Sequence, residues 1–201
     1  TLLPRSSESF LFHYPNSDKT PLQAEAMRLP HLAFRVEGEG EVESEYLRHA
    51  LAEAIERFGV EGVFTGGIRS RYQRDRFERV CEDLGLKFFS PIWGRRSEEH
   101  LRMLIKLGFK IMVVGVSAYG LDKGWLGRIL DEDAVDELID LSKRFGFDPA
   151  FEGGEAETMV LDCPIFEYSI GVLDAERIWL GDRGFLLIKE ACLEPKVEKS
   201  L

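Results

Sequence analysis

The residue types that could carry chemistry are densest between residues 151 and 166, where the chain reads FEGGEAETMVLDCPIF. Glu152, Glu155 and Glu157 surround the pair Gly153 and Gly154, and an apolar stretch follows. Glycine tolerates positive φ and lets a backbone pass close to a ligand, so the three carboxylates can be turned toward one point. Such a cluster can hold magnesium through water, orient an amine or ammonium group, or remove a proton. The alternative is a surface turn whose glutamates face water.

A second candidate is the stretch GGIRSRYQRDR at residues 66–76, which joins a predicted strand to a predicted helix. The N-terminus of a helix attracts phosphate through its free N–H groups and its dipole. On a helix, Arg69, Gln73 and Arg76 share one face and Tyr72 flanks it, and guanidinium groups bind phosphate or carboxylate. The alternative is a solvated basic face that balances the acidic residues farther along the helix.

Two tryptophans each lie near a glycine and an arginine: Trp93 precedes Gly94 and Arg95, and Trp125 lies three residues before Arg128. Both groups suit an anionic, partly apolar ligand, whereas each tryptophan taken singly is better explained as a core residue. Residues 119–122, reading YGLD, can be explained as a turn that closes a buried strand.

The elements that must position these residues follow from periodicity and from glycine caps. In the first half we expect the strand 32–36, a loop at 37–43, the helix 45–58, the strand 60–65, the helix 70–84 and the strand 86–89. This alternation is typical of a parallel sheet with helices on its faces, so the fold class is α/β. Such sheets bind ligands beyond the carboxyl ends of their strands, which here are residues 66–76 and 91–95.

Beyond Gly94 the pattern changes to a smaller α+β domain with a β-rich end. We expect the helix 97–107, the buried strand 111–116, the helix 133–145 and strands at 159–165, 167–173, 176–180 and 185–191. The predicted domains are therefore 1–94 and 95–201. Residues 5–16 are expected to form a loop, and residues 196–201 a frayed end.

Composition excludes several classes of protein. A net charge of −10 over 201 residues argues against general nucleic-acid coating, so no direct nucleic-acid partner is expected. No apolar run approaches a membrane span, so no membrane partner is expected. The 3 cysteines and 4 histidines are scattered, which disfavours a zinc site or a disulfide framework and fits a cytoplasmic protein. The motifs GxSxG, HExxH, GxxxxGK[ST] and GxGxxG are absent from the chain.

Three runs together resemble one known family: GGIRSRYQRDRFERVCEDLGLKFFSPIWGR, MVVGVSAYGLDKGWLGRILDED and EGGEAETMVLDCPIF. They look like the diphthine–ammonia ligase family of the PP-loop ATP pyrophosphatases, and the resemblance covers essentially the whole chain. It implies a nucleotide-binding domain of the adenine nucleotide alpha hydrolase (HUP) type. It also implies that ATP adenylates the carboxylate of diphthine on translation elongation factor 2, after which ammonia attacks and releases AMP. The implied cofactors are ATP and Mg²⁺, and a homodimer is left open.

The resemblance also implies roles for particular residues. Glu152, Glu155 and Glu157 would be catalytic, either orienting ammonia or the trimethylammonium group of diphthine or helping to hold magnesium. Nucleotide binding would involve Thr1, Gly66, Gly67 and Arg69. Substrate binding would involve Tyr72, Gln73, Arg76, Trp93, Arg95, Arg128, Gly153, Gly154 and Thr158.

Two departures from the family pattern affect these expectations. Ala156 stands where the family usually has Phe or Tyr, which removes an aromatic wall. The SGGKDS phosphate loop is not in the sequence. We therefore expect a fragment of a longer chain, with a gap in the parallel sheet and poor ATP binding by residues 1–201 alone. The alternatives are a non-catalytic nucleotide- or metabolite-binding protein and a PP-loop adenylating enzyme that acts on RNA.

Overall fold

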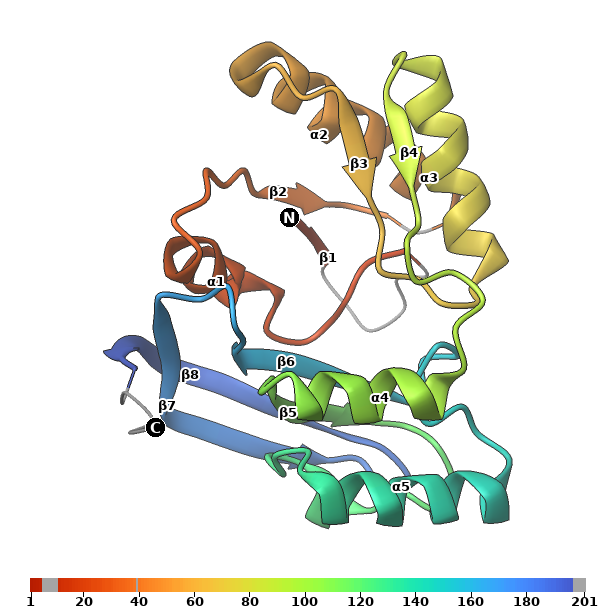
Figure 1. The fold of residues 1–201 in the computed structure, drawn as a ribbon, viewed down its shortest axis with the longest axis vertical. Helices are drawn as coiled ribbons and strands as arrows, with labels where there is room; N and C mark the ends of the chain where they lie inside the picture. The colour runs from red at the N-terminus through yellow and green to blue at the C-terminus, as the bar shows by residue number, and fades with distance from the viewer. Residues whose placement is uncertain (5–10, 39, 197–201) are drawn as a thin grey trace. The chain divides into compact units, whose positions relative to one another are not determined.

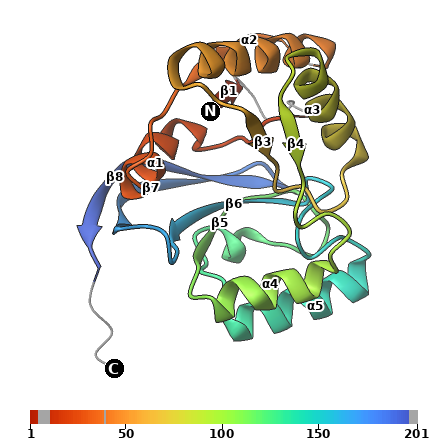
Figure 2. The ribbon, with the colours of Figure 1, turned by 45° about the horizontal axis from the view of Figure 1, so that its top comes forward.

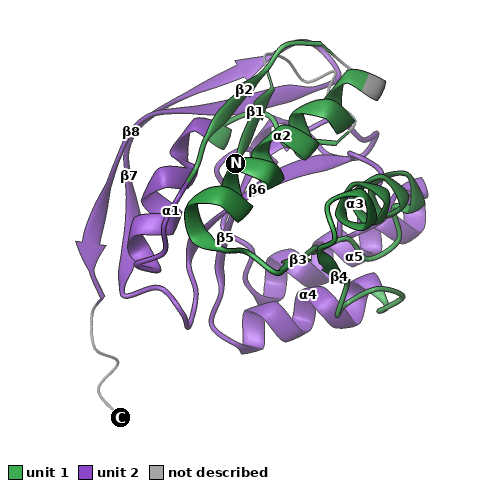
Figure 3. Cartoon of the chain, turned by 90° about the horizontal axis from the view of Figure 1, so that it is seen from above, with its two compact units in different colours: residues 1–17, 32–96 green, residues 18–31, 97–201 purple. Residues whose placement is uncertain are grey.

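The computed structural model describes residues 1–4, 11–38 and 40–196, so the expected loop 5–16 and the expected frayed end lie partly outside the described residues. The chain divides into two compact units, which Figure 3 colours separately. Unit 1 comprises residues 1–17 and 32–96, and unit 2 comprises residues 18–31 and 97–201. The domains 1–94 and 95–201 stay a prediction, and the compact units differ from them chiefly because residues 18–31 pack with the second half of the chain.

Unit 1 contains short parallel strands and two longer helices (Figure 1). Its elements are β1 Leu2–Pro4, β2 Phe34–Val36, α2 Glu41–Phe58, β3 Gly62–Phe64, α3 Arg71–Asp83 and β4 Lys87–Phe89. The strands form two separate parallel pairs, β1 with β2 and β3 with β4. The predicted parallel character of these strands is confirmed, and the described strands form two separate pairs, not one continuous sheet.

Local signals determine the ends of the helices in unit 1. Gly59 ends α2 with φ 64, and its N–H donates to the carbonyl of Ile55 at 2.9 Å. Ser70 caps α3, because its side chain accepts a hydrogen bond from the N–H of Gln73 at 3.4 Å. The prediction of a loop at 37–43 was wrong at its end, since α2 already begins at Glu41. Gly40, with φ 69, is the N-cap residue of the helix there.

Unit 2 is a four-stranded antiparallel sheet with helices packed on it. Its helices are α1 Thr20–Ala26, α4 Ser97–Lys106 and α5 Glu132–Phe145, and its strands are β5 Lys110–Val116, β6 Ala156–Asp162, β7 Tyr168–Trp179 and β8 Gly184–Pro195. Two short 3-10 helices complete it, η1 Ser17–Lys19 and η2 Lys123–Trp125. The first residue of η1, Ser17, is the last residue of the first segment of unit 1. The strand order is β6-β5-β8-β7. Figures 1 and 2 show α4 and α5 side by side on one face of this sheet and α1 on the other.

The predicted β-rich end of the chain is confirmed with one correction. The strands expected at 167–173 and 176–180 are one continuous strand, β7, which pairs with β8 along its whole length. Its pairing shifts register on either side of Asp174, a polar residue in the middle of the strand. Asp is unfavourable in a strand interior, and this made the sequence look like two strands separated by a turn.

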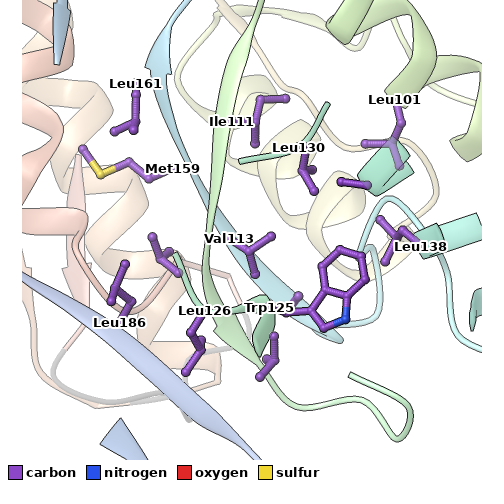
Figure 4. Packing of buried hydrophobic residues seen from close by; sticks show 14 of the residues in the cluster. Leu101, Ile111, Val113, Trp125, Leu126, Leu130, Leu138, Met159, Leu161 and Leu186 are labelled. Atoms are coloured by element: carbon purple, nitrogen blue, oxygen red, sulfur yellow. The ribbon is translucent and has the colours of Figure 1, made fainter. Parts of the chain in front are cut away.

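The core of unit 2 is built around its sheet and includes residues of α4, of α5 and, with Ala26, of α1; Figure 4 shows part of it. Helix α5 buries Ala134, Val135, Leu138 and Ile139, an apolar stripe at helical spacing. Trp125 is only 4% exposed and packs in the same cluster. Burial of a large apolar side chain contributes about 1.5–3 kcal/mol, so this cluster holds the end of the sheet that carries the candidate site.

Candidate functional site

The glutamate turn, defined here as residues 151–157, leads from α5 into β6 at one end of the unit 2 sheet. Ala156 pairs with Val116, the last residue of β5, and Val116 also pairs with Gly184, the first residue of β8. The turn therefore lies at the end of the sheet where β5 finishes and where β6 and β8 begin. Ala156 is 5% exposed, so this small residue of the turn is buried.

The backbone of the turn takes two left-handed conformations. Phe151 has φ 65 and Gly154 has φ 79, and the N–H of Gly154 donates to the carbonyl of Phe151 at 3.1 Å. Gly153 lies close to the Glu155 side chain, because a Cβ there would lie 2.8 Å from Oε1 and the carboxylate would have to shift. Gly154 thus provides the positive φ, and Gly153 allows the Glu155 carboxylate to lie close to the backbone. Both are properties expected of a glycine pair from the sequence.

Glu155 is held by the backbone of its own turn. Its Oε1 accepts a hydrogen bond from the N–H of Asp148 at 3.0 Å, and its Oε2 accepts one from the N–H of Gly153 at 2.8 Å. Asp148 is fixed in turn, since its Oδ2 accepts from the hydroxyl of Ser97 at 2.9 Å. Both carboxylate oxygens of Glu155 therefore have structural partners, which favours a positioning role for this residue.

A neighbouring segment, the Ser117 turn (residues 117–121), is hydrogen-bonded to the backbone of the glutamate turn. The hydroxyl of Ser117 donates to the carbonyl of Gly154 at 2.6 Å. The N–H groups of Ser117 and Ala118 both donate to the carbonyl of Glu155, at 2.9 and 3.1 Å. Two turns that are far apart in sequence are thereby joined into one structure at the end of the sheet.

Glu157 lies on β6 opposite Gly115 of β5. A Cβ on Gly115 would come within 3.1 Å of the Cβ of Glu157, so the glycine leaves the room that this side chain occupies. The register shifts between Val113 and Gly115, which is the pattern of a β-bulge. Bulges are common beside functional sites because they redirect a side chain. The next residue of β6, Thr158, is exposed.

The carboxylates of the glutamate turn do not form a metal site with their described neighbours. In residues 1–4, 11–38 and 40–196, no group of three or more His, Cys, Asp and Glu side chains is arranged to hold a metal ion. Glu155 already uses both oxygens on backbone N–H groups, which fits poorly with a magnesium ligand. The turn can instead present carboxylate charge from Glu152 and Glu157 to a cationic or hydrogen-bonding group.

The candidate site in unit 1 is formed by the segments that follow β3 and β4. The N–H of Gly94 donates to the carbonyl of Ile68 at 2.9 Å, and Ile68 is 2% exposed. Residues 66–76 and 91–95, both predicted to lie beyond the carboxyl ends of parallel strands, are therefore brought together. A Cβ on Gly66 or Gly67 would meet no atom within 4 Å, so a ligand can approach the backbone there.

Two arginines of α3 stack on aromatic rings. The guanidinium of Arg74 lies 4.6 Å from the centre of the Trp93 ring, and that of Arg76 lies 3.4 Å from the centre of the Tyr72 ring. The predicted helical face was wrong in one respect: Arg69 precedes the cap Ser70 and is not part of α3. It thus cannot share a helical face with Gln73 and Arg76.

The other predicted site residues lie in different places. The terminal amino group of Thr1 donates to the carbonyl of Leu32 at 2.6 Å in unit 1. Arg95 is exposed in the same unit. Arg128 belongs to unit 2, where it stacks on the buried ring of Trp125 at 4.3 Å and forms an ion pair with Glu137 at 2.6 Å. The convergence of the glutamate turn and residues 66–76 upon one ligand stays a prediction, because they belong to different units.

Sequence reasoning did not select Ser117, Asp148, Gly115 or Arg74. Their roles depend on partners far away in the chain, and a lone serine or aspartate carries no spacing signal. A weak signal existed for Gly115, since a glycine inside a buried strand often marks a bulge or a close approach.

Among the described residues, no helix combines the length and the low polarity that crossing a bilayer requires.

Comparison with known proteins gives two matching families that follow one another along the chain. The family described as "Diphthamide synthase N-terminal domain" matches residues 1–88, and "Diphthamide synthase C-terminal domain" matches residues 96–193. A diphthine–ammonia ligase of Schizosaccharomyces pombe is 35% identical over 95% of this chain, which spans 34% of that protein. The diphthine–ammonia ligase of Homo sapiens is 37% identical over 94% of this chain and 77% of its own length. That of Mus musculus is 36% identical over 85% of this chain and 68% of its own length.

Proposed function

Because the chain belongs to the diphthine–ammonia ligase family, we propose that it takes part in the ATP-dependent amidation of diphthine on translation elongation factor 2. The product is diphthamide, and free ammonia is the nitrogen source. The observation that carries the proposal is the ordered match of both family domains to nearly the whole chain, residues 1–88 and 96–193. The protein substrate is a translation factor, so the cytoplasmic location is part of the proposal.

The proposed chemistry has two steps. A carboxylate oxygen of diphthine attacks the α-phosphorus of ATP, forming an acyl-adenylate while pyrophosphate leaves. The lone pair of ammonia then attacks the acyl carbon, the bond from that carbon to the AMP oxygen breaks, and the nitrogen loses a proton to solvent. This route makes AMP and pyrophosphate in equal amounts with the amide.

Unit 1 is proposed to bind the nucleotide as a HUP-type domain. The open backbone at Gly66 and Gly67 and the N-terminus of α3 are suited to anionic oxygens, because the helix dipole favours negative charge there. The contact between Gly94 and Ile68 supports a shared role for the two segments after β3 and β4. Arg69 and Arg95 are exposed on these segments and can add charge to the same site.

Unit 2 is proposed to bind the modified histidine of the protein substrate. The hydrogen bonds of Glu155 support a positioning role for it, in which it holds the glutamate turn in shape. Glu152 and Glu157 are then the proposed contacts to ammonia or to the trimethylammonium group. Since the described residues hold no metal-binding group of three or more side chains, we derive no step through a magnesium ion bound by the protein.

The test uses a protein containing this chain, with ATP, ammonium and elongation factor 2 that carries diphthine. The expected result is AMP and pyrophosphate that depend on both ammonium and diphthine, and a carboxamide in place of the carboxyl group by mass spectrometry. Unmodified elongation factor 2 is the matched control and is expected to give neither product.

Three other results would contradict the proposal. Nucleotide binding without AMP formation, under conditions in which a known ligase of the family is active, would favour the non-catalytic alternative. AMP formation that requires RNA would favour the RNA-modifying alternative. AMP formation that does not respond to ammonium would exclude free ammonia as the second substrate.

A further inference from the structure

We propose that Tyr119, at the tip of the Ser117 turn, is the aromatic face that receives the quaternary ammonium group of the substrate. This inference rests on the proposed function, and it adds a specificity-determining residue that the three glutamates do not include. From the sequence, we interpreted residues 119–122 as a turn that closes a buried strand. That interpretation assigns no role to the exposed ring of Tyr119.

Tyr119 is 85% exposed, the highest value among the exposed large hydrophobic side chains of the described residues. An aromatic ring left in water contributes little to the free energy of folding, because it removes almost no apolar surface from solvent. The ring is nevertheless attached to a segment that is bound closely to the glutamate turn through Ser117 and Ala118. Tyr119 is thus an accessible ring on a segment that is hydrogen-bonded to the backbone of the glutamate turn.

The orientation of the ring is set by packing beneath it. Tyr119 meets Phe145 edge to face, with 5.2 Å between ring centres and an angle of 87°. Gly120 has φ 101, and a Cβ there would lie 2.2 Å from Cδ2 of Phe145, so the turn can only lie this close to the ring with glycine at that position. With 85% of the residue exposed, the Tyr119 ring remains accessible to a ligand beside this contact.

The chemistry of the site matches a weakly hydrated cation. The face of an aromatic ring is negative and attracts quaternary ammonium groups, which cannot donate hydrogen bonds to carboxylates. The guanidinium of Arg144 already lies 5.0 Å from the centre of the Phe145 ring, which leaves Tyr119 as the aromatic face for a ligand. The Arg144 charge opposes a second cation, and the proposal requires the acidic residues of the glutamate turn, which is hydrogen-bonded to the Ser117 turn, to offset it.

The experiment compares Y119L and Y119F with a matched control, Y168L. Tyr168 is 38% exposed at the start of β7, where it pairs with Pro195 at the end of the sheet opposite Val116. Binding is followed by NMR with choline and with its uncharged tert-butyl analogue. KM and kcat for elongation factor 2 carrying diphthine are measured with the same variants.

We expect the unchanged protein to bind choline in preference to the neutral analogue. Y119L should lose this preference and raise KM about tenfold, equivalent to about 1.4 kcal/mol of binding free energy, with kcat little changed. Y119F and Y168L should behave like the unchanged protein, and circular dichroism should show all variants folded.

The inference is overturned if Y119L keeps both the choline preference and the original KM, or if Y119F loses as much as Y119L. Choline binding that does not exceed binding of the neutral analogue also overturns it, whether or not the protein is active. These outcomes differ from failure of the proposed function, which is a lack of ammonium-dependent AMP formation by the unchanged protein.

Discussion

Replacement of Glu155 by glutamine separates a positioning role from a catalytic one. The change keeps the size of the side chain and removes its charge. In the structure the two carboxylate oxygens accept from the N–H groups of Asp148 and Gly153, at 3.0 and 2.8 Å. A glutamine amide has only one oxygen, so it can accept from one of these N–H groups while its NH₂ group faces the other. The glutamate turn should therefore open more often in E155Q.

The magnitude follows from the hydrogen bond that is lost. A hydrogen bond to a charged group contributes about 1.5–3 kcal/mol, and the half-buried position of Glu155 favours the lower part of this range. We expect the free energy of opening of the turn to fall by about 1.5–2 kcal/mol. Each 1.4 kcal/mol is a factor of ten, so the amide protons of Asp148 and Gly153 should exchange roughly tenfold to thirtyfold faster.

The assay is amide hydrogen exchange of the unchanged protein and of E155Q, measured alongside the rate of amide formation at saturating ATP. If Glu155 positions the turn, the rate of amide formation falls together with protection of these two amides. An osmolyte such as TMAO, which favours compact states, should then restore part of the activity. The control is E152Q, which removes one charge from the same turn and should leave the exchange at Asp148 and Gly153 unchanged.

Two results would refute this reasoning. Unchanged exchange at Asp148 and Gly153 in E155Q would show that the carboxylate does not hold the turn. Unchanged exchange combined with a large fall in kcat would assign Glu155 to the chemistry itself.

Two further predictions concern packing and ionisation. G120A should lower the free energy of unfolding by about 1–3 kcal/mol more than G181A. Both glycines have positive φ, but only a Cβ on Gly120 would meet the Phe145 ring. Urea denaturation measures both losses, and equal losses would contradict this prediction. Burial raises the pKa of the Cys81 thiol, so stability should be independent of this group below the unfolded-chain pKa of about 8.5 and should fall as pH rises from there toward the raised folded value. C81A should weaken that alkaline loss in urea titrations under reducing conditions, and an identical pH dependence in both proteins would exclude the thiol as its source.

Several elements were predictable because the signals that determine them are local. The amphipathic stripe of α5 and the cap at Gly146, with φ 81, were readable from spacing and from one glycine. The parallel character of β3 and β4 followed from strands alternating with helices. The meeting of residues 66–76 and 91–95 followed in turn, because the carboxyl ends of parallel strands lie at the same edge.

Other features depended on contacts that the sequence does not announce. Helix α2 begins at Glu41 because of the backbone conformation of Gly40. The Gly- and Glu-rich composition of this segment had instead predicted a loop. The continuity of β7 required pairing with β8, which outweighed the poor strand propensity around Asp174. Arg69 was assigned to a helical face that the cap at Ser70 excludes.

By itself, the sequence determined which residue types are concentrated in the glutamate turn, where most helices end and which family the chain resembles. Only the tertiary structure decided what those residues touch. Ser117 and Gly154 are separated by 37 positions, and their hydrogen bond exists because β5 and β6 pair as antiparallel neighbours. The backbone partners of Glu155 and the ring partner of Tyr119 have the same physical origin. Hydrogen bonds and ring contacts between such residues depend on packing, whereas helix caps and periodicity depend only on neighbours along the chain.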